Sequence, residues 1–267
     1  MQDAIRLTPS FREKVWGKTR ISPWFPDSEK PIGEVWYVGV PDLPILVKLL
    51  FTSQRLSVQA HPADGEDGPA GKTEMWHILE ADPGASIAVG FRRPITRERL
   101  AESARTGEIE RLLNWIPVKP GDTFFCAAHT VHAIGAGVVL YEIQQNSDVT
   151  YRLWDYGRAR EMHVERAVPI CDLGVHPGAV TPKPLAPGRD ELARCKYFAT
   201  ELAQLKSGER IVPTPEKCQM WMVVEGRGRI GAQAFQPGEV WLLPEAGAQP
   251  EIRAEGDARL LRTYLPG

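Results

Sequence analysis

Residues 44–79 read PILVKLLFTSQRLSVQAHPADGEDGPAGKTEMWHIL, and this stretch decides the fold class. It contains three short apolar segments, PILVKLLF, LSVQAH and EMWHIL, each bounded by Pro, Gly, Ser or Asp. Segments of this length between turn-forming residues predict β-strands. The segment EVWYVGV at residues 34–40 has the same form, so we expect a meander of short strands.

The composition agrees with an all-β chain. The 24 glycines and 23 prolines make up about 18% of the 267 residues, which is typical of many turns. A helical pattern occurs at residues 96–114, TRERLAESARTGEIERLLN, where apolar residues recur every three or four positions around Gly107. We expect two short helices there, as an insert between strands.

Strand-like segments resume at residues 120–145, PGDTFFCAAHTVHAIGAGVVLYEIQQ, and continue through TYRLWDY at 150–156. Residues 172–190 are rich in glycine and proline, and the remainder of the chain again alternates short apolar segments with turns. Such a stretch is typical of a domain boundary. We therefore predict a first domain at 1–185 and a second at 186–267.

Two segments resemble each other across that boundary. PGDTFFCAAHTVH at residues 120–132 and PGEVWLLPEAGAQP at 237–250 both start with Pro, Gly and an acidic residue, followed by an apolar strand and a turn. The first copy ends in His132, whereas the second offers only Gln249. A duplicated barrel would explain the repeat and would place the chemistry in the first half.

Charge and targeting features exclude several classes of protein. The net charge of −2 and the pI near 6.3 do not suit a polynucleotide-binding surface. The N-terminus has no apolar signal segment, and the longest apolar stretch, 43–51, is too short to cross a bilayer. We expect no nucleic-acid or membrane partner and a cytoplasmic location.

The cysteines fit the same compartment. They are widely spaced and contain no CxxC pair, which predicts reduced thiols without a disulfide or a cysteine metal site. They are Cys126, Cys171, Cys195 and Cys218.

A candidate metal site follows from side-chain spacing. Gln59 and His61 share one face of a predicted strand, as do Lys72 and Glu74 if that segment is extended, and His132 follows at a turn. Two histidines, a glutamate and a glutamine favour zinc or a similar divalent ion. Each residue alone also has a structural explanation, since a histidine before proline commonly ends a strand.

Several segments resemble known families. Gly121, followed at the proper interval by Ala127, His129 and His132, partly matches the cupin metal-binding motif. The chain also closely resembles type I mannose-6-phosphate isomerases over residues 15–160. The matching segments are VWG at 15–17, IGEVW at 32–36, LPILVKLL at 43–50, RLSVQAHP at 55–62, GKTEMWHIL at 71–79, HAIGAG at 132–137 and LYEIQQNSDVTYRLWDYGR at 140–158.

The resemblance implies a fold, an activity and a set of roles. The fold would be two cupin (jelly-roll) barrels, with the helical insert in the first and no metal ligands in the second. The activity would be the interconversion of mannose 6-phosphate and fructose 6-phosphate, with one Zn²⁺ per chain. The implied roles are zinc binding by Gln59, His61, Glu74 and His132, substrate binding by Lys48, Ser57 and Lys72, and catalysis by Arg152.

Moving a carbonyl between C1 and C2 requires proton transfer through an enediolate. Arg152 is permanently charged and would stabilise that anion. Lys72, with a pKa depressed by desolvation and a divalent ion, is one candidate base, and Asp148 and Glu142 are rivals. Glu142, Gln144 and Asn146 alternate on one strand face, so we expect that face inside the barrel as substrate contacts, with Glu142 foremost, or as a structural ladder.

Other interpretations remain. A cupin oxygenase or epimerase-like enzyme would use the same metal barrel, and a non-catalytic sugar-binding module would use the barrel alone. Lys48 either points into a wet pocket or reaches the surface, and Arg55 and Arg158 are further candidates for an anionic substrate group. The chain also departs from the family in three ways. It has no separate helical domain, and AAHTVH at 127–132 replaces the usual turn with Pro and Gly. His77 takes a position that is commonly aromatic, although alternation points it away from Glu74. Sugar specificity and oligomeric state stay open, with a monomer among the options.

Overall fold

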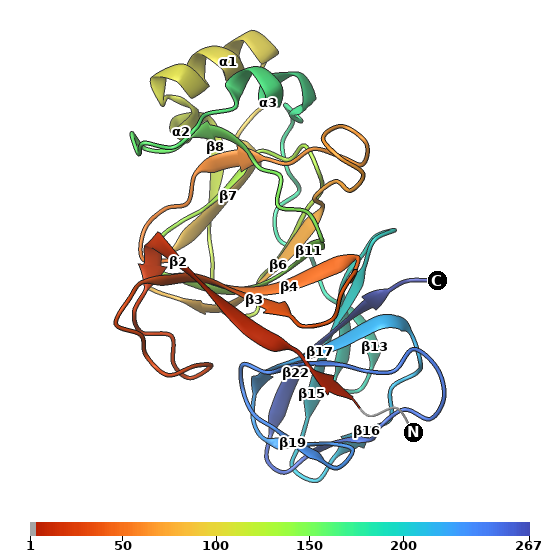
Figure 1. The fold of residues 1–267 in the computed structure, drawn as a ribbon. Helices are drawn as coiled ribbons and strands as arrows, with labels where there is room; N and C mark the ends of the chain where they lie inside the picture. Colours follow the sequence, from red (N-terminus) through yellow and green to blue (C-terminus); the bar gives the residue numbers. More distant parts are fainter. Residues whose placement is uncertain (1–3) are drawn as a thin grey trace.

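The computed structural model describes residues 4–267, in which antiparallel strands form four sheets (Figure 1). Two sheets come from the first part of the chain. In spatial order, the six-stranded sheet contains β2 (Thr8–Lys18), β3 (Ile32–Val38), β4 (Ile45–Phe51), β11 (Val138–Gln145), β6 (Glu74–Ala81) and β9 (Thr123–Cys126). The five-stranded sheet contains β12 (Tyr151–Trp154), β5 (Val58–Ala60), β10 (His132–Ile134), β7 (Ser86–Phe91) and β8 (Leu113–Pro117).

The other two sheets come mainly from the second part. The seven-stranded sheet contains β1 (Ile5–Arg6), β20 (Val240–Leu242), β17 (Lys217–Glu225), β22 (Ala258–Leu265), β15 (Ala199–Leu205), β14 (Arg189–Arg194) and β13 (Lys183–Ala186). The four-stranded sheet contains β16 (Arg210–Ile211), β21 (Ile252–Ala254), β18 (Gly228–Ile230) and β19 (Gln233–Phe235). The chain is mostly β, and the strands expected around residues 34–79 and 120–156 are confirmed.

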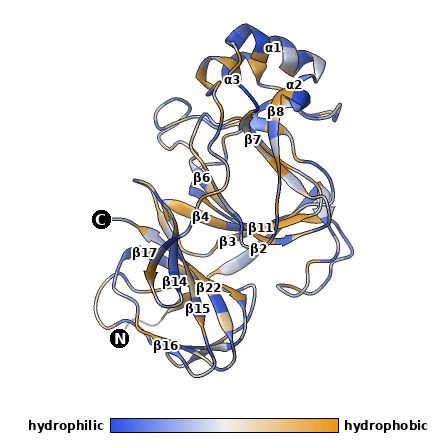
Figure 2. Ribbon diagram, turned by 180° about the vertical axis from the view of Figure 1, so that it is seen from behind, coloured by the Kyte–Doolittle hydropathy of each residue, from blue (hydrophilic) through white to orange (hydrophobic). Residues whose placement is uncertain are grey.

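The sheets stack in layers because successive side chains of a strand point to opposite faces. One apolar core lies between the five- and six-stranded sheets and includes Trp76 and Ile87. A second core lies between the six- and seven-stranded sheets and includes Val47 and Met220. A third lies between the seven- and four-stranded sheets and includes Trp221. Strands β4 and β17, which border the second core, are largely orange in Figure 2.

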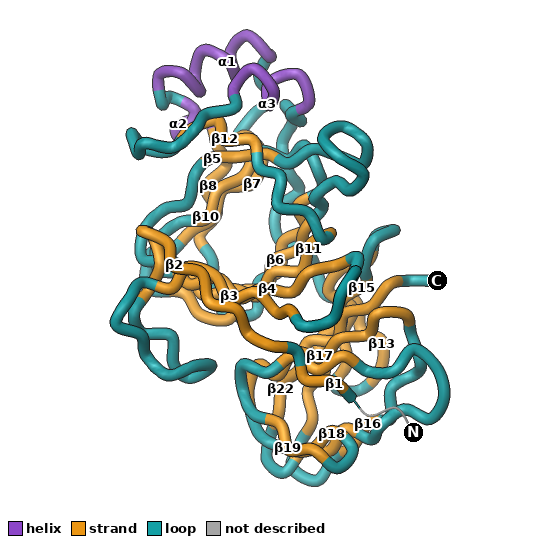
Figure 3. Tube along the Cα trace, in the orientation of Figure 1, coloured by secondary structure: helices purple, strands orange, loops and turns teal. Residues whose placement is uncertain are grey.

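Three helices gather at one end of the molecule (Figure 3). They are α1 (Arg97–Thr106), α2 (Ile109–Leu112) and α3 (Val164–Ile170). They cover the outer face of the five-stranded sheet, where Leu100 and Ala167 pack with Val58 and Ala133. Among these described helices, none has the length and apolar character needed to cross a bilayer.

The two helices expected at residues 96–114 are confirmed as α1 and α2. The hydroxyl of Thr96 caps α1 by accepting from the Arg99 amide, and Gly107 ends it with a φ of 81°. A Cβ on Gly107 would also lie 2.7 Å from the Trp154 ring, so both the backbone conformation and the space require glycine here. Helix α3 was not predicted, because it is short, contains Pro169 and buries only Ala167.

The predicted domain boundary at 185/186 stays a prediction. The seven-stranded sheet takes β1 from the beginning of the described chain and starts again at β13, inside the glycine- and proline-rich stretch. The thiols of the four cysteines are free.

Candidate metal centre

One wall of the candidate site is a row of side chains across the five-stranded sheet. In this sheet Val58, Ala60 and Ala133 face the helices, so their sequence neighbours Gln59 and His132 face the interior. Gln59 lies opposite His132 on β10 and opposite Arg152 on β12. Strand register therefore places three of the predicted site residues side by side.

A second row lies on the facing six-stranded sheet. Glu142 of β11 is paired with Lys48 of β4 on one side and with Trp76 of β6 on the other. Glu74 is two residues before Trp76 on β6, so it shares the same face. Lys48 and Glu142 are both buried, and their Nζ and Oε1 atoms lie 3.3 Å apart.

The predicted polar face of β11 is correct for Glu142 and Gln144 but wrong for Asn146. Gln144 is buried, and its amide donates to the carbonyls of Gln145 and Ser147, as in a structural ladder. Asn146 is exposed beyond the end of β11 and donates to the carbonyl of Leu43. The strand ends at Gln145, so the alternation does not extend to residue 146.

His61 and Lys72 reach the same point from the two ends of a loop. The amide of Lys72 donates to the carbonyl of Pro62, which closes the loop beside the strands. A Cβ on Gly71 would lie 2.6 Å from the backbone of Ala63, so only glycine permits this closure. The loop is also held by Asp64, whose carboxylate accepts from the Gly71 amide and from side chains on neighbouring elements.

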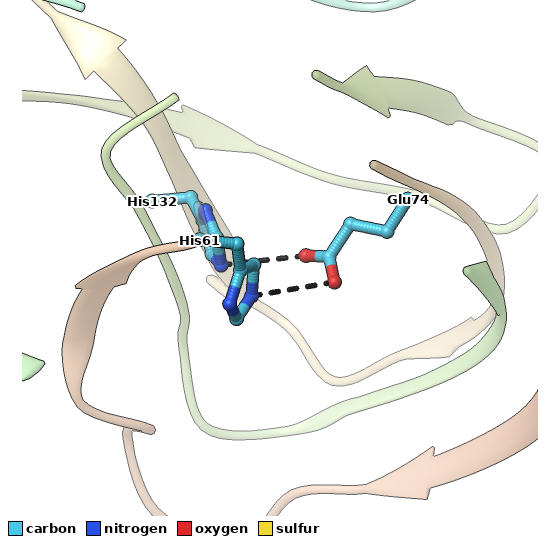
Figure 4. Close-up of side chains that lie close together, drawn as sticks. All are labelled: His61, Glu74 and His132. Atoms are coloured by element: carbon cyan, nitrogen blue, oxygen red, sulfur yellow. Dashed lines mark ion pairs between the residues drawn. The ribbon is translucent and has the colours of Figure 1, made fainter. Parts of the chain in front are cut away.

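His61, Glu74 and His132 converge in the buried interior (Figure 4). Their candidate ligand atoms all lie within 4.8 Å of one another. Nε2 of His61 is 3.5 Å from Oε2 of Glu74, and Nε2 of His132 is 3.3 Å from Oε1. Donors about 2.0 Å from a tetrahedral zinc ion lie roughly 3.3 Å apart, so these separations suit one ion.

Hydrogen bonds orient both imidazole rings for metal binding. Nδ1 of His61 donates to the carbonyl of Val149 at 2.9 Å, and Nδ1 of His132 donates to the carbonyl of Thr130 at 2.9 Å. A neutral ring that donates through Nδ1 has a free lone pair on Nε2. Burial lowers the pKa of His132 to about 4 and that of His61 well below its ordinary value, so both rings are neutral at pH 7.

Glu74 supplies the acidic member of the set. Its carboxylate is 1% exposed, and Oε2 forms an ion pair with Nζ of Lys72 at 3.1 Å, but neither oxygen has a partner with hydrogen-bond geometry among the described residues. Burial raises its pKa to about 7, although the charges of Lys72 and Lys48 oppose this shift. A buried carboxylate normally has partners, so its unsatisfied oxygens fit a site that a divalent cation would complete.

Gln59 lies at the edge of this cluster. Its Nε2 atom is 3.2 Å from Nε2 of His132, and its Oε1 accepts from the hydroxyl of Ser57 at 3.0 Å. Oxygen and nitrogen of an amide exchange places by a half-turn of the side chain. Gln59 therefore adjoins the three converging residues, and its oxygen would face them only with the amide turned.

Lys72 lies against the same carboxylate, and the lowered pKa expected for it beside a divalent ion stays a prediction. Its Nζ is 3.0 Å from Nε2 of His61 and 3.1 Å from Oε2 of Glu74. Burial acts to lower the pKa of Lys72, but attraction by Glu74 and Glu142 outweighs it and raises the pKa above the ordinary value. The sequence did not show that two carboxylates surround this amine.

A cavity of about 160 Å³ opens beside the cluster and is lined by polar side chains. The predicted residues Lys48, Ser57, Gln59, Lys72, Glu142, Asp148 and Arg152 all line it. Sequence reasoning missed Lys14, Glu34, Thr150 and Arg160, which line it too. Lys14 lies just before the family-like segment 15–17 and two residues from Trp16 on β2, and this i, i+2 spacing was the available signal.

Cations in this cavity differ in how far they are neutralised. Both carboxylate oxygens of buried Asp155 accept from Arg160, at 2.5 and 2.8 Å. The Nε of Arg152, in contrast, is buried and has no hydrogen-bond partner among the described residues. Of the weaker candidates, Arg55 pairs with Glu110 and Arg158 with Asp155, and neither lines the cavity.

The unusual AAHTVH turn closes beside the cluster. His129 has a φ of 75°, a conformation that favours glycine. Its amide donates to the carbonyl of His61, and its Nε2 lies 2.7 Å from the carboxylate of Glu66. The turn therefore keeps the backbone geometry that glycine would give and adds a side-chain contact to the loop after His61.

Comparison with known proteins shows which family this chain is similar to. Mannose-6-phosphate isomerase ManA of Bacillus subtilis (strain 168) is 30% identical over 326 residues, covering 98% of this chain and 99% of that protein. The mannose-6-phosphate isomerase of Streptococcus mutans is 29% identical, with 99% of each chain covered. The chain belongs to the mannose-6-phosphate isomerase family. No protein-family model matches it.

The solved structure of mannose-6-phosphate isomerase from Bacillus subtilis has the same fold. It superimposes with a TM-score of 0.87 at 26% identity, over 98% of this chain and all of that one. The mannose-6-phosphate isomerase family thus accounts for the whole described chain, second half included.

Proposed function

We propose that this chain is a zinc-dependent isomerase that interconverts mannose 6-phosphate and fructose 6-phosphate through an enediolate. The observation that supports this most strongly is the buried cluster of His61, Glu74 and His132, opening on a cavity lined by cations. Family membership supplies the substrate, which the names of the relatives state for those proteins.

Zinc is the ion we propose for the cluster. Two neutral imidazole nitrogens and one carboxylate are a typical donor set for catalytic zinc. Gln59 is the proposed fourth protein ligand, with its amide turned, so substrate or water would take a fifth position. A bound zinc ion would act as a Lewis acid on the sugar oxygens.

Arg152 is the proposed stabiliser of the enediolate. Its guanidinium is always charged, so it can face the developing anion without a proton transfer of its own. It lines the cavity in the same row as Gln59 and His132, and its buried Nε lacks a partner. A preorganised donor of this kind is worth about 10²- to 10³-fold in kcat.

Proton transfer and substrate binding fall to the other cavity residues. We propose Lys72 and Asp148 for moving the proton between C1 and C2, with Lys72 held against Glu74 at 3.1 Å. We propose Lys48, Ser57 and Glu142 for binding the sugar. Lys48 and Glu142 form a buried pair that can donate to and accept from hydroxyl groups without either charge being isolated.

The test is a coupled assay of mannose 6-phosphate isomerisation on wild type, Arg152→Ala and Arg93→Ala. We expect chelator to abolish wild-type turnover and zinc to restore it. Arg152→Ala should lower kcat about 10²- to 10³-fold, whereas the matched control at exposed Arg93 should match wild type. Metal-loaded wild type that turns over neither phosphosugar would contradict the proposal.

We also propose that each pair of facing sheets is one cupin barrel and that only the first binds metal. The six- and five-stranded sheets would form the first barrel, and the seven- and four-stranded sheets the second. The matched register of three strands in each half supports this assignment: Glu142 lies between Lys48 and Trp76 in the first, and Arg262 lies between Glu201 and Trp221 in the second.

A further inference from the structure

The backbone of Arg152 lies at an open edge of the sheet. Strand β12 is the outermost strand of the five-stranded sheet, next to β5. An edge strand presents main-chain groups that the sheet itself does not pair. The placement of the Arg152 guanidinium in the cavity therefore depends on what holds its backbone from the outer side.

His163 holds both main-chain groups of Arg152. The Arg152 amide donates to Nδ1 of His163 at 3.2 Å, and the His163 amide donates to the Arg152 carbonyl at 2.8 Å. The His163 carbonyl in turn accepts from the amides of Arg166 and Ala167 in the first turn of α3. One residue thus joins the edge of the sheet to the covering helix.

The bond at Nδ1 requires a neutral imidazole. An imidazolium has a proton on both nitrogens and cannot accept from a backbone amide. In the neutral ring the proton is then on Nε2, which lies 3.9 Å from the carboxylate of Glu161. Protonation of Nδ1 would direct its N–H at the Arg152 N–H and break the contact.

We propose that His163 is a positioning residue for Arg152, whose neutral ring fixes the edge of β12 and whose protonation releases it. This inference rests on the proposed isomerase function, because Arg152 is taken as the group that stabilises the enediolate. His163 itself does not line the cavity.

The groups around His163 favour the neutral ring at pH 7. Burial is the largest influence and lowers its pKa, and the charges of Arg152 and Arg166 act in the same direction. Glu161 and Asp67 oppose them, and the ring of Tyr151 stacks at 6.2 Å between centroids. The net pKa is below the ordinary value, so release is expected only in mildly acidic solution.

The experiment compares His163→Asn with His163→Leu. Asparagine has an oxygen near the position of Nδ1 that accepts but never protonates, whereas leucine has a similar volume and no acceptor. At pH 7.5 we expect His163→Leu to lower kcat about 10-fold with little change in KM, because a misplaced catalytic group costs rate. His163→Asn should stay within about 3-fold of wild type and lose less of its activity on acidification to about pH 5.5.

His176→Leu is the matched control. Nδ1 of His176 likewise accepts from a backbone amide, that of Gly178, but away from β12. His176→Leu should leave kcat within about 2-fold of wild type. Equal kcat for His163→Leu and wild type, or an acid limb unchanged in His163→Asn, would overturn the inference.

A readout without turnover separates this inference from the proposed function. In wild type the ¹⁵N–¹H resonance of Arg152 should shift as His163 titrates, and the shift should be absent in His163→Asn. If the Arg152 resonance does not shift while His163 titrates, the inference is wrong, whatever the activity. If zinc-loaded wild type turns over neither phosphosugar, the proposed isomerase function is wrong instead.

Discussion

The six-stranded and seven-stranded sheets contain the same arrangement of three paired strands. In the first sheet it adjoins the candidate metal site, and in the second its side chains bond to one another. In the first, Glu142 of β11 lies between Lys48 of β4 and Trp76 of β6. In the second, Arg262 of β22 lies between Glu201 of β15 and Trp221 of β17. Each trio has a tryptophan and a buried ion pair with a shortest N–O distance of 3.3 Å, but the charges are exchanged between the strands.

The two halves differ most at the position two residues before each tryptophan. Glu74 stands there in the first half; it forms an ion pair with Lys72 but has no partner with hydrogen-bond geometry among residues 4–267. Gln219 stands there in the second, where its Oε1 accepts from Trp221 and Arg262 and its Nε2 donates to Thr214. Gln249, which the sequence repeat aligned with His132, lies beside Gln219 at 3.5 Å.

This difference shows what makes one interior reactive and the other structural. An amide whose donors and acceptors are all paired stabilises the fold and leaves nothing for a ligand. A buried carboxylate that faces two imidazole lone pairs, with Lys72 on one oxygen, still has room for a divalent cation between these three residues. The same sheet geometry thus supports either outcome, and a few side chains decide between them.

Exchanging these two residues should have the largest effect. Glu74→Gln makes the first half resemble the second, so we expect zinc affinity and turnover to fall more than about 100-fold, the loss seen when only groups supporting metal ligands are changed. The fold should persist, because the amide is isosteric and neutral. Metal content after dialysis and the coupled assay measure this.

The reciprocal variant Gln219→Glu is the control. It should gain no metal site, because the second half lacks the two histidines. If Gln219→Glu bound a second zinc ion per chain, a carboxylate alone would be enough to create a metal site in the second half. The comparison would then be wrong.

Removing one partner of the second ion pair should cost stability rather than activity. Arg262→Leu leaves the buried Glu201 with only Arg189 and Tyr264, so we expect the free energy of unfolding to fall by about 3 kcal/mol. Urea unfolding measures this loss. Turnover by the folded fraction should be unchanged.

The matched change in the first half, Lys48→Met, should instead lower kcat/KM, because Lys48 lines the cavity. A double change, Arg262→Leu with Glu201→Leu, should recover part of the lost stability. If Arg262→Leu lowers kcat while unfolding stays the same, the second half is not structural as we describe it.

The smallest expected effect concerns the face of β6 that turns away from the site and toward the seven-stranded sheet, where Met75 and Leu79 also lie. His77 follows Trp76 and faces away from the site, while Met222 follows Trp221 in the second half. Burial lowers the pKa of His77 to about 4, with Arg259 adding to the shift. Between that value and the unfolded value near 6.5, the unfolded chain binds more protons, so stability falls as the pH falls through this window.

In wild type, His77 should lower the free energy of unfolding by about 1 kcal/mol for each pH unit between about pH 6 and pH 5, and His77→Met should remove this pH dependence. At pH 7.5 it should cost about 1 kcal/mol, since the Thr123 hydroxyl loses its partner. Urea unfolding at several pH values compares the variant with wild type. Parallel stability curves would mean that His77 is not the buried neutral group we describe.

Prediction from the sequence was most successful for local features. The strands between Glu34 and Leu79, the helix capped by Thr96 and the inward-facing Gln59 all follow from periodicity and turn residues. Helix α3 and the cavity residue Arg160 were missed, because one has a weak pattern and the other depends on Asp155 for its position. The two carboxylates that raise the pKa of Lys72 were missed because they lie 2 and 70 residues away in the sequence.

By itself, the sequence determined the class of fold, the family and the candidate ligands, because alternation, turn chemistry and motif order are properties of neighbouring residues. The tertiary structure alone decided that Glu74 has no partner with hydrogen-bond geometry while Gln219 is fully bonded, and that the backbone of Arg152 depends on His163. Those facts depend on strand register and on which groups meet across sheets. In the buried interior, a hydrogen bond stabilises the fold more than it would in water, and an unpaired polar group costs more.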